Sequence, residues 1–414
     1  MTLSVSLSGL NAAQTDLDTT GNNIANVGTA GFKGSTPSFA SLYGTSLLGS
    51  AGSKVTPGQG VVTTNLSQAF TEGTISQTGN PLDIAINGNG FLEVQTPTGI
   101  AYTRDGALQI NAQGLLSNDT GALVMGFNAP PSGGTVSGAL APIQVSKSNI
   151  SPVATSTLDY NINLSTSDPP INTATTPFSI ANPTSYNEST TTTVYDSLGA
   201  ARSLTTFFTQ VSGSGSPPQW ATHWELSSTT GVLVASGAGP TLAFNNSGAL
   251  TSGTGTINIT GLPNGAANLS IAEDFTGSSL SGLPFGVNSI ANNGSAGGQF
   301  SSLQIANDGS VIVNYSNGAT KTMGVIALAN FANPEGLIPT SNNNWFASQD
   351  SGPPTTNPPG VGGLGQLESG ALEGSNVDLS AQLVNLIVAQ QAYQANVQGI
   401  NVDQQDIQRL LTLQ

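Results

Sequence analysis

The chain has 414 residues, of which only 22 are acidic and 7 are basic, giving a formal net charge of −15. It contains no cysteine and a single histidine, which excludes disulfides, Cys/His zinc sites and thiol nucleophiles. Seven scattered cations cannot form the basic stripe that binds nucleic acid. A charged fraction of 7%, against about 25% in an average globular protein, leaves few groups for acid–base or phosphate chemistry. This composition favours an exported, β-rich protein with more than one domain.

The N-terminus carries neither a basic segment nor a continuous apolar segment, so it does not resemble a cleaved signal peptide. The longest dense apolar stretch, residues 383–389, is far shorter than the roughly 20 residues that span a membrane. We therefore expect no membrane insertion, and export by a route that needs no cleaved signal peptide.

Leucine and isoleucine recur near the N-terminus at a seven-residue spacing, which predicts an amphipathic helix. The expected seam consists of Leu3, Leu7, Leu10, Leu17 and Ile24. A stripe of about two positions in seven suits contact with another helix better than packing on a globular core, which is the alternative interpretation.

Two low-charge segments rich in glycine and proline follow the pattern of extended connectors. Residues 27–70 contain only Lys33 and Lys54 as charges, and residues 351–365 read SGPPTTNPPGVGGLG. Their length would allow the domains that they join to shift.

The middle of the chain is a series of short alternating segments separated by Gly, Asn, Asp or Pro. Residues 82–86 alternate and are followed by an expected turn, NGNG, at 87–90. Residues 196–199 and 316–318 are expected turns between later strands. This spacing predicts antiparallel sandwiches or barrels rather than parallel α/β units.

The C-terminal segment repeats the seven-residue pattern over a longer span, with one glycine and no proline after Asp378. Asp378 or Ser380 is expected to cap the start of this helix. The first seam position consists of Leu379, Leu386, Tyr393, Ile400 and Ile407. The second consists of Leu383, Gln390, Val397, Gln404 and Leu411. We expect the two terminal helices to pair with each other and with neighbouring subunits.

The ionisable residues predict no catalytic, cofactor-binding or metal site. Alternation places His223 and Glu225 on the face of a strand opposite to its tryptophans, with no partner that would make them catalytic. Glu273 and Asp274 form the only adjacent acidic pair, and we interpret both as solvated turn residues. A calcium site made of Asp and backbone oxygens stays open as an alternative.

Five motifs, in a specific order, carry a family resemblance. Residues 21–33 (GNNIANVGTAGFK) resemble the N-terminal motif of bacterial flagellar rod and hook proteins. Residues 86–91, 102–106, 372–379 and 390–396 resemble its later motifs. The motif residues at the two ends of the chain are Asn22, Asn23, Ala25, Asn26, Gly31, Phe32, Lys33, Ser375, Asn376, Val377 and Asp378.

The middle of the chain resembles hook proteins within that family. Residues 192–199 (TTVYDSLG) with the following strand, and residues 308–337, are similar to hook-protein segments. Residues 128–185 and 226–270 are the least distinctive. Gln391 stands where the family commonly has a basic residue.

The resemblance implies a structural subunit that is not an enzyme and needs no cofactor. Its expected fold is multidomain α+β: terminal coiled-coil helices plus two antiparallel all-β domains. These expected parts are terminal helices at 1–26 and 378–414, connectors at 27–70 and 351–377, an inner β domain at 71–150 and 295–350, and an inserted outer β domain at 151–294.

The resemblance also implies a role and a set of partners. The subunit would assemble with its own copies, outside the cell, into a curved tube that works as a universal joint between the motor rod and the filament. Implied partners are the distal rod protein, the hook cap protein, the hook–filament junction protein and the flagellar type III export apparatus, with no nucleic acid. The alternatives are a distal rod subunit, a secreted β-rich adhesin or, as the weakest of the three, a polysaccharide-active enzyme.

Overall fold

The computed structural model describes residues 2–43, 58–129, 138–211 and 219–412. The chain divides into two compact units. The first unit comprises residues 1–147, 302–314 and 320–414, and the second comprises residues 148–301 and 315–319. The outer domain expected at 151–294 falls within the second unit.

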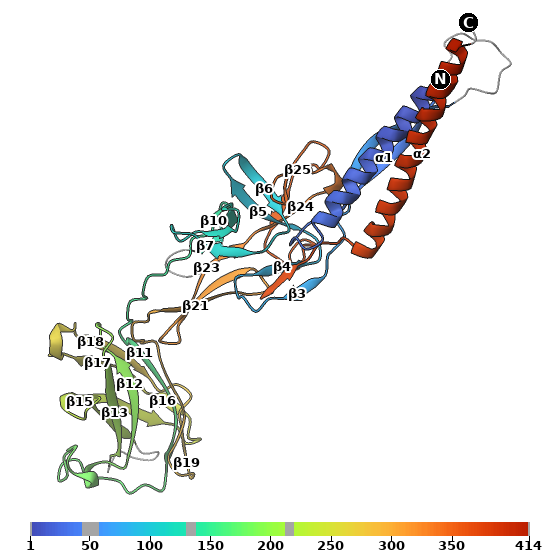
Figure 1. Ribbon diagram of the computed structural model, residues 1–414. Coiled ribbons are helices and arrows are strands. Elements are labelled where there is room, and N and C mark those ends of the chain that lie inside the picture. The colour runs from blue at the N-terminus through green and yellow to red at the C-terminus, as the bar shows by residue number, and fades with distance from the viewer. Residues whose placement is uncertain (1, 44–57, 130–137, 212–218, 413–414) are drawn as a thin grey trace. The chain divides into compact units, whose positions relative to one another are not determined.

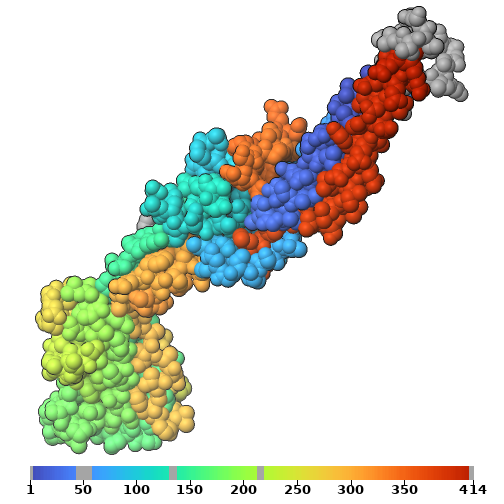
Figure 2. All heavy atoms as spheres, in the orientation of Figure 1, coloured from blue at the N-terminus to red at the C-terminus, as the bar shows by residue number. Residues whose placement is uncertain are grey.

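Two long antiparallel helices dominate the first unit. Helix α1 (Thr2–Ala25) and helix α2 (Leu379–Thr412) run side by side, as Figures 1 and 2 show. Small residues allow the close approach: a Cβ built on Gly9 would lie 2.5 Å from Asn396 Oδ1, and one built on Gly399 would lie 3.2 Å from Ser6 Oγ. Neither helix contains proline, so both ladders of backbone hydrogen bonds are uninterrupted.

The expected connector at 27–70 contains a two-stranded antiparallel ribbon. Strand β1 (Ser35–Tyr43) pairs with β2 (Gly58–Gln68), and residues 44–57 between them lie outside the described residues. The ribbon packs on α1, where the backbone N–H of Val61 donates to Ser8 Oγ at 3.1 Å. Much of this expected connector is therefore ordered secondary structure.

A 13-stranded sheet supplies most strands of the first unit. Its main path runs β21 (Phe300–Ile305), β22 (Ser310–Tyr315), β23 (Thr320–Ile326), β9 (Leu123–Asn128), β5 (Phe91–Thr96), β6 (Gly99–Thr103), β26 (Asn344–Phe346), β25 (Ile338–Thr340). Five further strands pair off this path: β7 (Leu108–Ile110), β8 (Leu116–Asn118), β10 (Ala141–Pro142), β24 (Leu328–Asn330) and β27 (Thr355–Asn357). An aromatic core, centred on Phe91, Tyr102, Phe331 and Trp345, packs against it.

Two small sheets lie where the β strands meet the helices. Strand β3 (Ile75–Gln77) pairs with β29 (Ala371–Glu373), and β4 (Ile84–Asn87) pairs with β28 (Gln366–Ser369). The expected turn at 87–90 does join β4 to β5, but these two strands do not pair with each other. Strand β4 pairs with β28, far away in the sequence, which local turn signals cannot reveal, whereas β5 pairs with the next strand, β6, and also with β9 and β24.

Two five-stranded sheets enclose the core of the second unit. One contains β17 (Thr254–Ile259), β18 (Leu269–Asp274), β11 (Thr157–Ser165), β19 (Ser279–Ser281) and β20 (Gly286–Asn292). The other runs β12 (Glu188–Tyr195), β13 (Ala201–Gln210), β14 (Trp220–Ser228), β15 (Leu233–Phe244), β16 (Leu250–Ser252). Leu158, Tyr160 and Ile271 of the first sheet share one core cluster with Phe208 and Trp220 of the second.

The expectation of purely antiparallel β domains is wrong for this unit. Strand β11 pairs in parallel with both β18 and β19. Parallel pairing requires a crossover connection rather than a hairpin, and here the whole second sheet lies in the chain between β11 and β18. The expected turn at 196–199 is confirmed: Gly199 has a φ of +81°, and the turn joins β12 to β13.

Candidate functional site at the helix root

The motif residues from both ends of the chain converge where α1 ends and α2 begins. We call this region the helix root and define it as residues 22–35, 69–73, 104 and 373–382. It includes the short segments that enter and leave the helix pair. All of it lies within the first unit.

A buried ion cluster lies at the centre of the helix root. The Lys33 ammonium donates to Glu373 Oε1 at 2.6 Å, and Arg104 Nη1 donates to Glu373 Oε2 at 3.1 Å. The side chains of Lys33 and Glu373 are both 0% exposed. The backbone N–H of Gly73 also donates to Glu373 Oε1, at 2.9 Å. One carboxylate therefore compensates two buried cations.

Backbone carbonyls accept further hydrogen bonds from both cations. Lys33 Nζ donates to the Thr71 carbonyl at 2.7 Å, and Arg104 Nη2 donates to the Gly88 carbonyl at 2.8 Å. The Arg104 guanidinium also lies 5.4 Å from the centre of the Phe91 ring. Burial lowers the pKa of Lys33, and the hydrogen bond that Lys33 donates to Glu373 opposes this shift.

Two asparagines tie the backbone of the helix root together. Asn23, on the last turn of α1, accepts from the Ser35 N–H at 3.0 Å and donates to the Ser35 carbonyl at 2.8 Å. Asn376, just before α2, accepts from the Gly34 N–H at 2.8 Å and donates to the Ala69 carbonyl at 2.7 Å. The end of α1 and the start of α2 are thus both hydrogen-bonded to residues 34–35, the segment that enters β1.

Helix α2 starts with a side-chain cap. Asp378 Oδ1 accepts from the N–H groups of Ser380 at 2.8 Å and Ala381 at 3.2 Å. A carboxylate at this position also interacts favourably with the positive end of the helix dipole. Of the two expected capping residues, Asp378 is confirmed.

Glycine is required where the chain leaves α1. Gly31 has a φ of +66°, and a Cβ there would lie 2.6 Å from the Arg104 carbonyl carbon. Its N–H donates to the Glu373 backbone carbonyl at 2.8 Å, so the motif glycine brings this segment against both Arg104 and Glu373.

The other motif residues have smaller roles in the helix root. Phe32 is half-buried, and its carbonyl accepts from the N–H of Asn376 at 3.4 Å. The Val377 N–H donates to Ser375 Oγ at 3.2 Å. Asn22 and Ala25 are exposed on α1, and Asn26 donates to the Asn22 carbonyl at 2.9 Å.

The helix pair buries only part of the expected seams. Leu10, Leu17 and Ile24 of α1, and Leu386, Tyr393 and Ile400 of α2, are half-buried, while Leu3 and Leu7 of α1 and Leu379, Leu383, Val397 and Ile407 of α2 are exposed. The side chain of Leu411 lies outside the described residues. Among the described side chains of α2, Ala389 is the fully buried one. It lies three positions after Leu386, whereas the expected second seam position, Gln390, lies four positions after it. Small residues such as Ala389 therefore determine which side of α2 packs on α1, and a search for large apolar residues does not detect them.

The first turns of α2 carry an apolar surface that none of the described residues covers. We call it the outer patch; its members Leu379, Leu383, Val384, Ile387 and Val388 are between 43% and 60% exposed. Contiguous exposed apolar residues of this kind mark an interaction surface.

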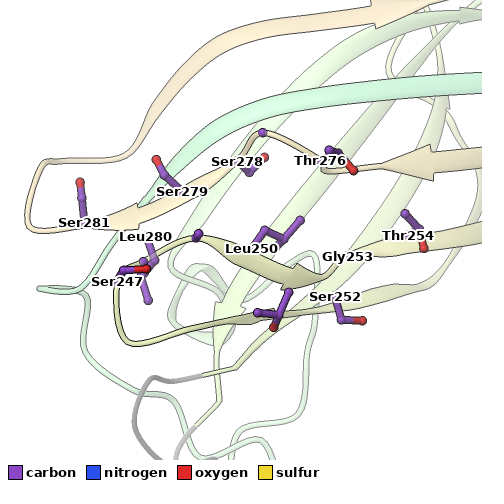
Figure 3. A pocket seen from close by; sticks show the side chains of 14 residues that line it. Ser247, Leu250, Ser252, Gly253, Thr254, Thr276, Ser278, Ser279, Leu280 and Ser281 are labelled. Atoms are coloured by element: carbon purple, nitrogen blue, oxygen red, sulfur yellow. The ribbon is translucent and has the colours of Figure 1, made fainter.

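The described residues of the second unit offer no catalytic arrangement. The His223 ring stacks on Phe178, with centroids 4.1 Å apart. Glu273, expected to be solvated, is instead 1% exposed in the core, because it lies on a strand whose alternation turns Asp274 outward. An open hollow of about 630 Å³ is lined mainly by serine, threonine and glycine and has no ionisable lining residue (Figure 3).

The described part of the chain has neither a metal-binding cluster nor a membrane-spanning helix. No three His, Asp or Glu side chains there converge to hold a metal ion. No helix among the same residues is long and apolar enough to cross a membrane.

Sequence reasoning placed Lys33 and Asn376 in the site but omitted Arg104 and Glu373 from it. The sequence did contain a signal for these two residues, since both lie in family motifs (residues 102–106 and 372–379) and charges are rare in this chain. A charged residue inside a motif of such a protein is a good candidate for a buried ion pair.

Family models match four segments of the chain. The flagella basal body rod protein model matches residues 3–33, and the flagellar hook protein FlgE/F/G D1 domain matches residues 85–165. The flagellar basal body protein FlaE D2 domain matches residues 161–295, and the flagellar basal body rod FlgEFG protein C-terminal model matches residues 368–413. The first and last matches contain most of the helix root.

Similarity to individual proteins extends over the whole chain. The chain is 40% identical to the flagellar hook protein FlgE of Salmonella typhimurium, covering 100% of both chains, and 30% identical to that of Treponema pallidum, covering 98% of both. The crystal structure of Helicobacter pylori flagellar hook protein FlgE2 shares the fold, with a TM-score of 0.56 and 13% identity over 72% of this chain and 100% of that one. The chain therefore belongs to the flagellar hook protein FlgE family and is a structural subunit of the hook.

Proposed function

We propose that this subunit polymerises with its own copies into a curved, flexible tube that transmits torque from the motor rod to the filament. The observation that carries the proposal is the outer patch of α2, whose five apolar side chains the chain itself leaves exposed. In a tube of identical subunits, the helices of neighbouring copies would cover this patch. Residues 1–26 and 378–414 would then form the inner coiled-coil wall, with Leu3 and Leu7 among its contacts.

The helix root supports the mechanical half of the proposal. A torque-bearing subunit needs a stiff joint between its helices and its β domains. Lys33, Arg104 and Glu373 lock together three chain segments in a buried cluster, and Asn23 and Asn376 clamp the backbone around it. Such over-determined contacts resist small rotations of the helices.

Within the same proposal, the β domains, the connectors and the partner proteins have the roles that the family resemblance implies. Residues 71–150 and 295–350 form the inner domain, residues 151–294 form the inserted outer domain, and residues 27–70 and 351–377 connect them to the wall. The distal rod, hook cap and hook–filament junction proteins are the neighbours in the assembled flagellum. The flagellar type III apparatus exports the chain to the outside of the cell, without a cleaved signal peptide.

The test is polymerisation of full-length variants, followed by electron microscopy. Val388→Asp places a charge in the outer patch, which should abolish tubes. Gln398→Glu adds the same charge at an exposed polar position on the same helix and should leave tubes intact. Thermal unfolding should show that both variants retain folded β units.

Two outcomes would contradict the proposal. Normal curved tubes from Val388→Asp would remove the outer patch from the assembly interface. Straight tubes from the unaltered chain would favour a drive shaft, as in a distal rod, over a flexible joint.

A further inference from the structure

Glu273 is a carboxyl group enclosed by the core of the second unit. It lies on β18, between β17 and β11, and is 1% exposed. Both of its carboxyl oxygens are buried and have no hydrogen-bond partner among the described residues. Buried carboxylates normally have charged or hydrogen-bonding partners, because desolvating the charge is costly.

The opposite sheet makes room for this carboxyl but offers it no proton donor. A Cβ built on Gly239 of β15 would lie 3.2 Å from Glu273 Oε2. Thr222 of β14 lies beside the same glycine, and its hydroxyl already donates to the Pro240 carbonyl at 2.6 Å. The site therefore fits the size of a carboxyl group without stabilising a negative charge.

No cation faces Glu273 from the strands packed around it. Strands β15 and β17 carry no ionisable residue, and Arg202 of β13 is paired with Asp196 at 2.9 Å. On β14, His223 and Glu225 alternate with the inward-facing tryptophans. On β11, Asp159 is exposed, and on β18 itself Asp274 alternates with Glu273.

Tyr160 of β11 is the ionisable residue that shares the core with Glu273. Its hydroxyl is hydrogen-bonded to Thr206 Oγ1 at 2.7 Å. The negative charge of an ionised Glu273 would disfavour ionisation of this tyrosine, after the larger effect of burial. Tyr160 therefore adds no compensation for the carboxylate.

We propose that Glu273 is a pH-sensitive switch in the second unit: the two sheets accommodate it when protonated, and its ionisation destabilises their packing. Burial raises the pKa of Glu273 from 4.5 to about 7. Between these two values the folded state keeps a proton that the unfolded state has lost. Stability is therefore full below pH 4.5, falls as the pH rises toward 7 and levels off above it.

The test is urea unfolding of the full-length chain between pH 5 and 8, with tryptophan fluorescence as the measure of unfolding. A Trp345→Phe background leaves Trp220 and Trp224, both in the second unit, as reporters. In this background we compare Glu273 with Glu273→Gln, which has the same shape and cannot ionise. The ratio of their unfolding equilibrium constants should change about tenfold per pH unit between pH 5 and 7 and be constant above that range.

Asp274→Asn is the matched control, because it removes a carboxyl from the next residue on the same strand. Hydrogen bonds from Thr276 lower the pKa of Asp274, so its titration lies below the tested range and its ratio to the parent should stay constant. Parallel pH curves for the parent and Glu273→Gln would overturn the proposal.

A carboxyl ¹³C titration of the unsubstituted chain covers the case in which Glu273→Gln fails to fold. One glutamate resonance with a midpoint near pH 7 is expected. A set of glutamate resonances that all titrate near pH 4.5 would overturn the proposal.

Discussion

Lys33 and Glu373 are 340 positions apart in the sequence, yet the ammonium nitrogen of one lies 2.6 Å from a carboxylate oxygen of the other. This contact joins the segment that leaves α1 to the strand that precedes α2. Arg104 donates to the other carboxylate oxygen of Glu373 and completes the cluster. The three residues act as one unit, because each cation depends on the same anion.

Replacement of Glu373 by glutamine should be the most damaging single change in the helix root. It leaves Lys33 and Arg104 buried without an anion, at a cost of about 3–5 kcal/mol in the free energy of unfolding. Urea unfolding of the full chain measures this. Glu368→Gln, on the neighbouring strand β28, is the control, and its half-exposed side chain keeps an acceptor for Gln77. Equal midpoints for the two variants would show that the cluster is energetically neutral.

Asn376→Ala should loosen the start of α2. The change removes the acceptor of the Gly34 N–H and the donor to the Ala69 carbonyl, which costs about 1–3 kcal/mol. Hydrogen exchange should show faster exchange at Gly34 and in the first turn of α2. Asn401→Ala, on the exposed side of α2, should change neither; identical exchange in both variants would argue against the clamp.

Gly106→Ala should destabilise the first unit by about 1–3 kcal/mol through overpacking. Gly106 is buried, and a Cβ there would overlap the backbone carbonyl oxygen of Ile84, which cannot move aside as a side chain would. Gly28→Ala is matched to it, since no atom lies within 4 Å of a Cβ at Gly28. Thermal unfolding should separate the two variants, and a stable Gly106→Ala would mean that β4 shifts readily.

His223 should make the second unit less stable in acid. Burial lowers the pKa of His223, so below about pH 6.5 the unfolded state binds a proton that the folded state resists. Stability should therefore fall as the pH drops from 7 to 5, in the opposite sense to the contribution of Glu273. His223→Gln should remove this component from the unfolding curves; an unchanged pH dependence would mean that the imidazole titrates normally.

The sequence predicted the terminal helices, the β-rich middle and the family, because these depend on local pattern and on motifs. Seven-residue spacing placed Leu386, Tyr393 and Ile400 on the side of α2 that faces α1. It did not find Ala389, since close helix contact here depends on small residues rather than on large apolar ones. The parallel pairing of β11 with β18 was also beyond reach, because no local signal encodes a partner more than 100 residues away.

The ionisable residues show the same limit. Strand alternation correctly puts Glu273 and Asp274 on opposite faces, but it cannot say which face is the core. The sequence therefore suggested two solvated carboxylates where the structure has one. Likewise, Arg104 and Glu373 were visible as motif residues, while their common contact with Lys33 depends on long-range folding.

The long-range pairing of both units bears on the order in which the chain can fold. Strand β11 finds β18 and β20 only after residue 292 is available, and Lys33 finds its anion only at residue 373. A chain that emerges from its N-terminus therefore carries unsatisfied strands and a lone cation until nearly all of it is present. Folding dominated by such distant contacts is slow. The contact that joins the two ends of the finished first unit therefore forms only when about the last tenth of the chain remains to emerge.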